Sequence, residues 1–324
     1  MDKMTVHAID SLDLKILAEL DNDARIPNTR IAKKLRVNKN VVNYRINNLE
    51  KTGIIKGYYT IIDAYKLEYQ GYRLYLKFQY ADPIKEEEIM THFVKLKNTW
   101  WIAYIKGNWD MAILFWVKNQ MEMVGEMEKF FEKYRDFVEA HVLLVYYGIG
   151  HYRLPFAKKY LKGNAKFEHA MTGETVEIDI TDRKLLEFLS SNARATLVEI
   201  AKELQLTPAA ARYRIEQLKK KKVVLGFRPI FDIKKLGYSQ YKLDINVKET
   251  AVIKKMHAFA KEHDNIFYLD QTLGYADVEF EIYVDNHEQF FDIVREIRSE
   301  FSGFIKDHRF FMFEEITKIK YLGY

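Results

Sequence analysis

The sequence predicts an α+β fold in which one arrangement occurs twice: a winged helix-turn-helix domain followed by a ferredoxin-like βαββαβ domain. Two observations support this prediction. Residues 38–58, NKNVVNYRINNLEKTGIIKGY, align without a gap to residues 207–227, TPAAARYRIEQLKKKKVVLGF, at an offset of 169 (213 − 44). After each copy, the helical hydrophobic period changes to strands of period two that alternate with longer helices. A period of this length is too long for a solenoid repeat and indicates two domain pairs in tandem.

Composition places the chain among globular proteins. Its 324 residues are 48% hydrophobic, which is ample for packed cores. No uncharged apolar run approaches the ~20 residues that cross a bilayer, and the start of the chain lacks the basic-then-apolar order of a signal peptide. The absence of cysteine excludes disulfides and thiolate ligands, and the nine histidines have no ligand-like spacing. We therefore expect a cytoplasmic protein with no metal, no cofactor and no membrane partner.

The first predicted domain, residues 1–62, contains three short helices. Asp10 is placed to cap the first helix, and Asn28 is placed to cap the second. The third helix has apolar residues at spacings of four and three, which predict a buried stripe. This stripe consists of Val42, Ile46 and Leu49. Gly53 ends the third helix, and residues 54–62 are predicted to form a small β-hairpin, the wing.

Residues 63–152 are predicted to form the first ferredoxin-like domain. The expected order is strand 73–80, helix 84–96, strand 99–107, strand 111–117, helix 121–134 and strand 141–148. The four tryptophans of the chain lie in this domain and favour core packing over a cofactor site. Residues 153–177 break the pattern and are predicted to be a linker, in which 166–171 and 174–178 pair as a hairpin.

The second half repeats this order. Residues 178–232 are predicted to form the second winged helix-turn-helix domain, and residues 233–324 the second ferredoxin-like domain. Thr196 with Glu199 predicts a capping box, and Thr207 precedes a proline at the favoured first helical position.

Basic residues concentrate in both helix-turn-helix segments. Between residues 29 and 58, about eight basic side chains face a single carboxylate, Glu50, for a local charge of roughly +7. The equivalent window, residues 198–228, carries roughly +5. The net charge of the whole chain is only +5, which is a weak sign of nucleic-acid binding. The concentration of basic residues in these two segments is the stronger sign.

The motifs of each half resemble those of the Lrp/AsnC (feast/famine) family of transcription regulators. The shared pattern is D-x-x-D-x-x-I-L-x-x-L, then A-R, then V-x-x-R-I-x-x-L-E-x-x-G-I-I-x-G-Y, then D-x-x-K-L. The first half matches it nearly throughout, whereas the second departs at Ala211 and Lys222. The resemblance extends to the sheet domains, which are similar to the family's effector-binding, dimer-forming domain. It implies a sequence-specific regulator that binds double-stranded DNA and responds to an amino acid or similar small effector.

The resemblance places the third helix of the first half in the major groove. Side chains that point away from its apolar stripe are then available to base edges and phosphates, and asparagine pairs with adenine. With the neighbouring basic residues, the candidates are Arg30, Lys33, Lys39, Asn40, Asn43, Tyr44, Asn47 and Lys51. A solvated polar face is the alternative. Arg45 and Arg214 lie beside the apolar stripes and are expected to pair with carboxylates inside their own domains.

The second half offers a different set of side chains. Ala209 can make only methyl contacts, and Glu216 repels phosphate. The candidates for backbone contact are Arg212, Tyr213, Lys219 and Lys220. The alternative is a structural copy that reads no sequence.

Two turns in the sheet domains resemble the family's Gly-Asp-x-Asp turn, near which effectors bind. They are residues 107–110 and 274–277, and the candidate effector residues are Gly107, Asp110, Gly274 and Asp277. A hairpin turn with a capping aspartate explains the same residues without a ligand.

Other functions and assemblies stay open from the sequence. The architecture also resembles that of siroheme decarboxylases, which rely on a His-rich stretch at the second strand of the sheet domain. At that position this chain has TWWIAYIKG and IFYLDQTLG, which contain no histidine. We therefore expect that the protein is not an enzyme. A nucleoid-organising protein of low specificity is the second alternative. For assembly, we expect the two halves to form an internal pseudo-dimer, with a homodimer or higher oligomer as the rival.

Overall fold

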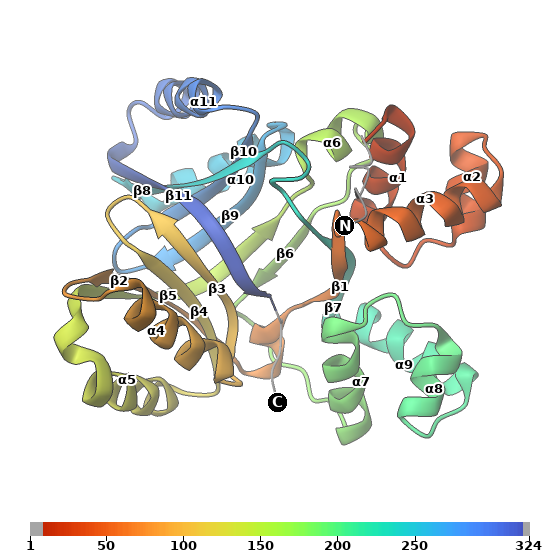
Figure 1. The fold of residues 1–324 in the computed structure, drawn as a ribbon, viewed down its shortest axis with the longest axis horizontal. Helices are drawn as coiled ribbons and strands as arrows, with labels where there is room; N and C mark the ends of the chain where they lie inside the picture. Colours follow the sequence, from red (N-terminus) through yellow and green to blue (C-terminus); the bar gives the residue numbers. More distant parts are fainter. Residues whose placement is uncertain (1–8, 320–324) are drawn as a thin grey trace, which may run out of the picture.

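The computed structural model describes residues 9–319, so the first eight residues of the first predicted domain and the last five of the fourth lie outside it. Figure 1 shows two helix-turn-helix domains on one side of the molecule and the sheet domains with their helices on the other. The α+β architecture of two helix-turn-helix and two ferredoxin-like units is confirmed. No helix in the described part of the chain is long and apolar enough to cross a membrane.

Each helix-turn-helix domain consists of three helices. In the first half they are α1 (Ser11–Asn22), α2 (Asn28–Leu35) and α3 (Lys39–Lys51), and in the second half α7 (Ile180–Ser191), α8 (Leu197–Glu203) and α9 (Pro208–Lys220). The predicted caps of α1, α8 and α9 are present, because Asp10, Thr196 and Thr207 accept backbone N–H groups there. Asn28 was expected to cap α2, but Pro27 holds the cap position and Asn28 is the first helical residue. Its side chain is therefore free to contact other elements.

The predicted wing hairpin of residues 54–62 is wrong. Each half supplies one strand, β1 (Ile55–Ile62) or β7 (Val224–Phe231), and these two pair with each other in an antiparallel ladder, here called the ribbon. The register places Tyr58 opposite Pro229 and Thr60 opposite Phe227. Pairing between halves satisfies backbone groups along the whole strand, which a short hairpin inside residues 54–62 could not do.

The sheet domains follow the predicted βαββαβ order. The first contains η1 (Ala64–Leu67), β2 (Gln70–Phe78), α4 (Pro83–Lys95), β3 (Thr99–Lys106), β4 (Met111–Val117), α5 (Gln120–Tyr134), η2 (Arg135–Phe137) and β5 (Val138–His151). The second contains β8 (Ser239–Val247), η3 (Thr250–Val252), α10 (Ile253–Glu262), β9 (Ile266–Leu273), β10 (Val278–Val284), α11 (His287–Glu300) and β11 (Ile305–Ile319).

Strand pairing joins the two sheet domains into one ring. Within residues 9–319 the order is β2-β4-β3-β11-β8-β10-β9-β5, and β5 pairs back with β2. The pairs that cross between halves are β3 with β11 and β5 with β9. The helices cover the outer faces, with α4 and α5 on the first sheet and α10 and α11 on the second. β5 therefore pairs on both sides, with β2 and with β9, and this closes the ring.

The predicted linker is folded. It contains α6 (Pro155–Leu161), which packs against α1, and β6 (Glu168–Met171), which pairs with β5. The expected hairpin between 166–171 and 174–178 is therefore wrong. The pairing of β2 with β5 ends at Tyr146, so residues 148–151 of β5 have an edge that β6 can use.

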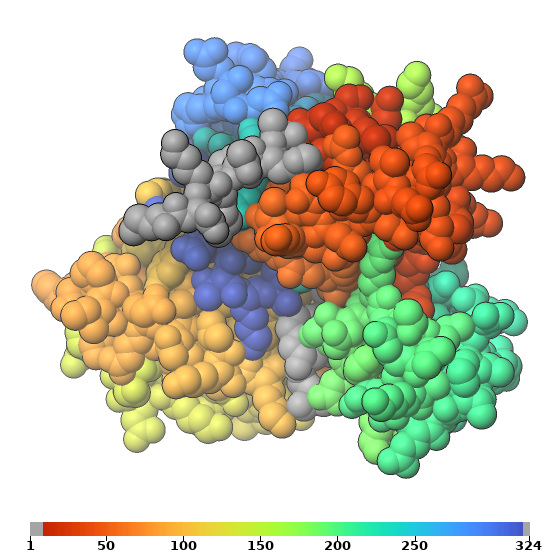
Figure 2. Space-filling model, turned by 45° about the vertical axis from the view of Figure 1, so that its right-hand side comes forward, coloured from red at the N-terminus to blue at the C-terminus, as the bar shows by residue number. Residues whose placement is uncertain are grey.

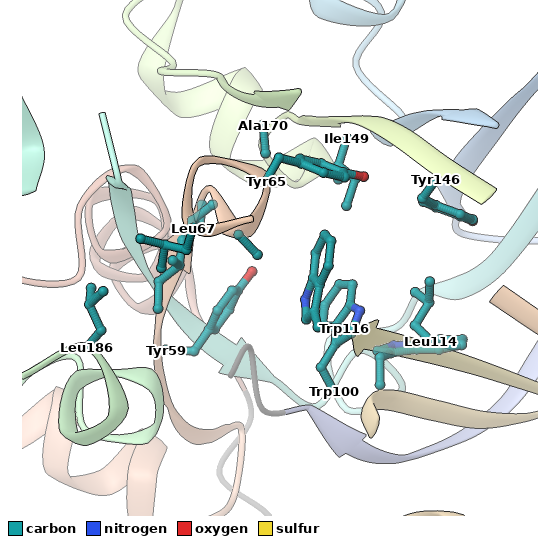
Figure 3. Packing of buried hydrophobic residues seen from close by; sticks show 14 of the residues in the cluster. Tyr59, Tyr65, Leu67, Trp100, Leu114, Trp116, Tyr146, Ile149, Ala170 and Leu186 are labelled. Carbon is teal, nitrogen blue, oxygen red and sulfur yellow. The ribbon is translucent and has the colours of Figure 1, made fainter. Parts of the chain in front are cut away.

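Aromatic side chains fill the space between the ribbon and the first sheet. The rings of Trp100 and Trp116 stack with centroids 5.8 Å apart, and Tyr65 meets Trp116 edge-on at 5.1 Å. Figure 3 shows these three side chains together, with Tyr59 of the ribbon nearby. All four tryptophans are buried, so their predicted role in core packing is confirmed.

Candidate nucleic-acid interface

Helix α3 separates its apolar stripe from a polar face. Val42, Ile46 and Leu49 are buried in the core of the domain. The exposed predicted side chains on this helix are Lys39, Asn40, Tyr44, Asn47 and Lys51. Arg30 and Lys33 on α2 are exposed as well. The basic side chains in this set form no ion pair with a carboxylate within residues 9–319, so their charge is available to phosphates. They are Arg30, Lys33, Lys39 and Lys51.

Asn43 differs from its neighbours on α3. It is only half-exposed, and its Oδ1 accepts a hydrogen bond from Nδ2 of Asn28 at 2.6 Å. Oδ1 of Asn28 in turn accepts from Nη2 of Arg194, which belongs to the other half. The side chain of Asn43 therefore faces the junction between the helix-turn-helix domains.

On helix α9 the predicted residues Arg212, Tyr213, Lys219 and Lys220 are all exposed. Lys219 already pairs with Glu216 at 3.1 Å, one turn earlier on the helix. This pairing lowers the positive charge that α9 presents to DNA. The sequence likewise predicted fewer side chains on α9 that could read bases.

The arginines beside the apolar stripes pair inside their own domains, as predicted. Nη1 of Arg45 lies 2.6 Å from Asp10 and 3.1 Å from Asp13, and Nη1 of Arg214 lies 2.7 Å from Asp179 and 2.8 Å from Asp182. Backbone N–H donation and the arginine lower the pKa of Asp10, and the same causes lower that of Asp179. These ion pairs tie the first helix of each domain to its third.

A second pair of arginines, which the sequence analysis missed, joins the two domains. Nη1 of Arg25 donates to the carbonyl oxygens of Ala193 and Ala195 at 2.7 and 2.8 Å. Its guanidinium lies over the ring of Phe227, and that of Arg194 lies over the ring of Tyr58. Both relations repeat at the offset of 169 (194 − 25 and 227 − 58). The repeated Ala-Arg pair was the signal that could have found them.

The space between the two domains forms a cavity of about 440 Å³. Figure 2 shows the two helix-turn-helix domains side by side on this face of the molecule. The charged residues of the cavity wall are Arg25, Lys39 and Arg194, all basic. The domains therefore present adjoining basic surfaces and not two separate ones.

The aspartates of the two turns predicted to bind an effector contact the backbone of neighbouring strands. Oδ2 of Asp110 accepts from the backbone N–H of Phe78 at 2.8 Å, and Oδ2 of Asp277 accepts from that of Val247 at 2.8 Å. Lys77 also pairs with Asp110. Gly107 and Gly274 both have positive φ, which the turns require. Each carboxylate thus ties its turn to the end of a neighbouring strand, β2 or β8.

The interior of the ring is charged and tightly filled. Lys242 pairs with Asp270 and Glu279, both at 2.8 Å, and Arg73 lies 3.8 Å from Glu279. The cavity that adjoins these residues measures only about 80 Å³. No group of three or more His, Cys, Asp or Glu side chains in the described chain is placed to hold a metal ion.

Comparisons with known proteins agree with this geometry. A model described as "Winged helix-turn-helix DNA-binding" matches residues 9–56, and the AsnC-type helix-turn-helix domain matches residues 178–219. The HTH-type transcriptional regulator Ptr1 of Methanocaldococcus jannaschii is 33% identical over 101 residues, which cover 31% of this chain and 68% of that protein. The chain belongs to the Lrp/AsnC family. Another Lrp/AsnC relative, the regulatory protein AsnC of Haemophilus influenzae, is 45% identical over 64 residues, but these cover only 20% of this chain and 43% of that relative.

A solved structure resembles this Lrp/AsnC protein over nearly its whole length. The siroheme decarboxylase NirDL superposes with a TM-score of 0.64 and 12% identity, covering 97% of this chain and 94% of that one. At this identity the likeness concerns the fold alone. It does show that the order of four domains occurs in another protein.

Proposed function

We propose that the protein is a sequence-specific, DNA-binding transcription regulator of the Lrp/AsnC type, located in the cytoplasm. The observation that carries the proposal is the exposed face of α3, where asparagines and a tyrosine lie among unpaired basic side chains. Hydrogen-bonding side chains of this kind read base edges, and the surrounding cations bind phosphates. The adjoining face of α9 supplies further basic residues.

We further propose that one chain acts as an internal pseudo-dimer. Three strand pairings cross between the halves, namely β1 with β7, β3 with β11 and β5 with β9. A single chain thereby carries two helix-turn-helix domains of different sequence, so its DNA site need not be palindromic. The rival assembly is a homodimer in which like domains pair between chains.

Selection of duplex fragments from a random pool, followed by sequencing, tests the proposal. We expect an enriched sequence that the purified protein binds far more tightly than unlabelled random DNA. If random DNA competes as well as the selected fragments do, the nucleoid-organising alternative holds instead.

The enzyme alternative has little support from the residues present. The stretches TWWIAYIKG and IFYLDQTLG, where siroheme decarboxylases have histidines, contain none. We therefore propose a protein without decarboxylase activity. An absorbance spectrum with added siroheme and a mass spectrum of the recovered tetrapyrrole test this, since a shifted Soret band together with loss of CO2 from the tetrapyrrole would favour the enzyme.

A further inference from the structure

The cavity between the two helix-turn-helix domains, here called the junction cavity, belongs mainly to the first domain. Residues 25–29, Lys39 and Asn43 supply most of its wall, whereas the second domain supplies residues 194–196. Lys39 also lies on the exposed face of α3. The wall of the junction cavity therefore continues into the helix face that is proposed to read bases.

A chain of hydrogen bonds from the second domain determines which atom Asn43 offers to this cavity. A guanidinium group contains only donors, so the Asn28 atom that accepts from Nη2 of Arg194 is Oδ1. The Nδ2 group of Asn28 then points to Asn43, whose Oδ1 accepts from it at 2.6 Å. Nδ2 of Asn43 has no hydrogen-bond partner in the part of the chain that the structure describes. Asn43 therefore offers the cavity a hydrogen-bond donor.

The charges of the cavity wall favour an anion. Arg25, Lys39 and Arg194 are its charged residues, and none of them forms an ion pair with a carboxylate within residues 9–319. Burial lowers the pKa of the Arg25 guanidinium, and the positive charge of Arg194 lowers it further, although Asp23 acts in the opposite direction. An anion held between the two domains would relieve this repulsion.

Phosphate oxygens fit this wall better than base edges do. A DNA phosphate carries a negative charge and accepts hydrogen bonds from asparagine, threonine and lysine side chains. The junction cavity offers Nδ2 of Asn43, Nζ of Lys39 and the hydroxyl of the exposed Thr29. Bidentate pairing of an asparagine with adenine needs its oxygen as well as its nitrogen, and Oδ1 of Asn43 already accepts from Asn28.

The second domain lacks an equivalent of this chain of hydrogen bonds. At the offset of 169, Leu197 takes the place of Asn28 and Arg212 that of Asn43. Leucine cannot accept a hydrogen bond or orient a partner, and Arg25 donates to backbone carbonyl groups instead. The junction cavity is therefore a one-sided feature of the molecule.

We propose that the junction cavity binds one backbone phosphate of the DNA, on one strand and between the two half-sites, and that this contact fixes the spacing between them. This site rests on the proposed function, because its ligand is the duplex that the two domains read. The phosphate would contact Lys39 and Asn43 of the first domain and lie close to Arg194 of the second, so both domains act on it.

Scanning a selected duplex with methylphosphonates tests this site. Each duplex carries one uncharged methylphosphonate in place of one phosphate, and fluorescence anisotropy measures its affinity for the full chain. Phosphates beside α3 and α9 should each contribute to binding. We expect one further sensitive position, on one strand between the half-sites, where the uncharged group weakens binding about tenfold.

Variants of the cavity wall show whether the junction cavity holds that position. In Asn43→Ala and Lys39→Gln, the loss caused by the central methylphosphonate should shrink to about threefold or less, because a partner of the phosphate is already missing. Asn43→Asp should bind the uncharged duplex more tightly than the charged one, because a carboxylate then faces the phosphate. The control is Arg30→Gln, which removes an exposed cation of α2 outside the cavity wall. It should weaken binding but keep the whole loss at the central position.

Calorimetric titration of the DNA-free chain with inorganic phosphate distinguishes a DNA phosphate from a free anion. We expect no saturable binding at millimolar phosphate, because a single ion lacks the contacts that α3 and α9 make with the rest of the duplex. Saturable binding that Asn43→Ala abolishes would assign the cavity to a free anion and overturn the proposal.

The remaining outcomes distinguish this site from the function on which it rests. If no phosphate between the half-sites is sensitive in the wild type, the phosphate site is refuted and DNA binding stands. The same holds if the central methylphosphonate weakens binding of folded Asn43→Ala and Lys39→Gln as much as that of the wild type. Equal sensitivity at one position on each strand would also refute the site, since the cavity is one-sided. If the wild type binds no duplex, the proposed function fails and the site fails with it.

Discussion

Arg25 and Arg194 occupy equivalent positions in the two halves, and each guanidinium crosses to the other helix-turn-helix domain. Arg25 donates to the carbonyls of Ala193 and Ala195, and Arg194 donates to the Asn28 side chain. The aromatic rings beneath them, Phe227 and Tyr58, are equivalent as well. The relative placement of the two DNA-binding domains therefore depends on contacts to which both halves contribute.

Arg25→Ala should weaken this junction. Hydrogen bonds from a charged group contribute about 1.5–3 kcal/mol, so we expect the free energy of unfolding in urea to fall by about that amount. The variant should also tolerate inserted base pairs within the selected site better than the wild type does. Arg36→Ala, an exposed arginine in the same domain, is the control. If both variants tolerate inserted base pairs equally well, Arg25 does not fix the spacing between the two DNA-binding domains.

DNA binding should depend steeply on salt because unpaired cations surround α3. Lys39→Glu or Lys51→Glu should weaken binding on every sequence and reduce the slope of log K against log salt by about 1 or more. Fluorescence anisotropy at several salt concentrations measures this. Lys129→Glu on α5, remote from the interface, serves as the control. Affinity that stays constant between low and moderate salt would contradict the prediction.

The two helix-turn-helix domains should differ in what they read. Asn40→Ala and Asn47→Ala should each relax specificity by about 1–3 kcal/mol per lost base contact, whereas Arg212→Ala should lower affinity and keep the preferred site. The sequence placed Asn43 on the same DNA-facing side of the helix. Its bond to Asn28 now leads us to expect altered site spacing from Asn43→Ala instead. Selection experiments on all four variants decide, and identical losses of preference for Asn47→Ala and Arg212→Ala would refute the difference.

The mass in solution should be that of one chain. Light scattering at micromolar concentration is expected to give 38.6 kDa, because the pairings that would join two chains are made within one. About 77 kDa (2 × 38.6) at every dilution would indicate the homodimer, or two pseudo-dimers joined through another face. A cross-link between β3 and β11 that forms only between different chains would rule out the internal arrangement.

Glu281 inside the ring should make stability depend on pH. Burial raises its pKa to about 7 from the ordinary 4.5, so between these values the folded state holds a proton that the unfolded state releases. Stability is therefore lost as pH rises through this window. Glu281→Gln keeps the carbonyl that accepts from Gln240 and should be more stable than the wild type above pH 7, by about 1–3 kcal/mol. Urea unfolding at several pH values measures this, with exposed Glu139→Gln as the control. A constant difference between wild type and Glu281→Gln across pH would refute it.

Local chemistry made much of the fold predictable. The caps at Asp10 and Thr196, the stripe of Val42 and Ile46, and the pairing of Arg45 with nearby carboxylates all depend on residues within one small domain. Helical spacing and short-range hydrogen bonds determine such features, so they can be read from a single segment.

The partner of each strand was decided by the tertiary structure. A hydrophobic period of two identifies β1, β6 and β11 as strands, but it does not say which other strand each one pairs with. For this reason the hairpins expected within residues 54–62 and 166–178 were wrong. The same limit hid the junction and the cavity. Asn43 belongs to a polar helix face by its spacing, yet only the approach of the second half brings Arg194 to Asn28 and turns that face partly inward.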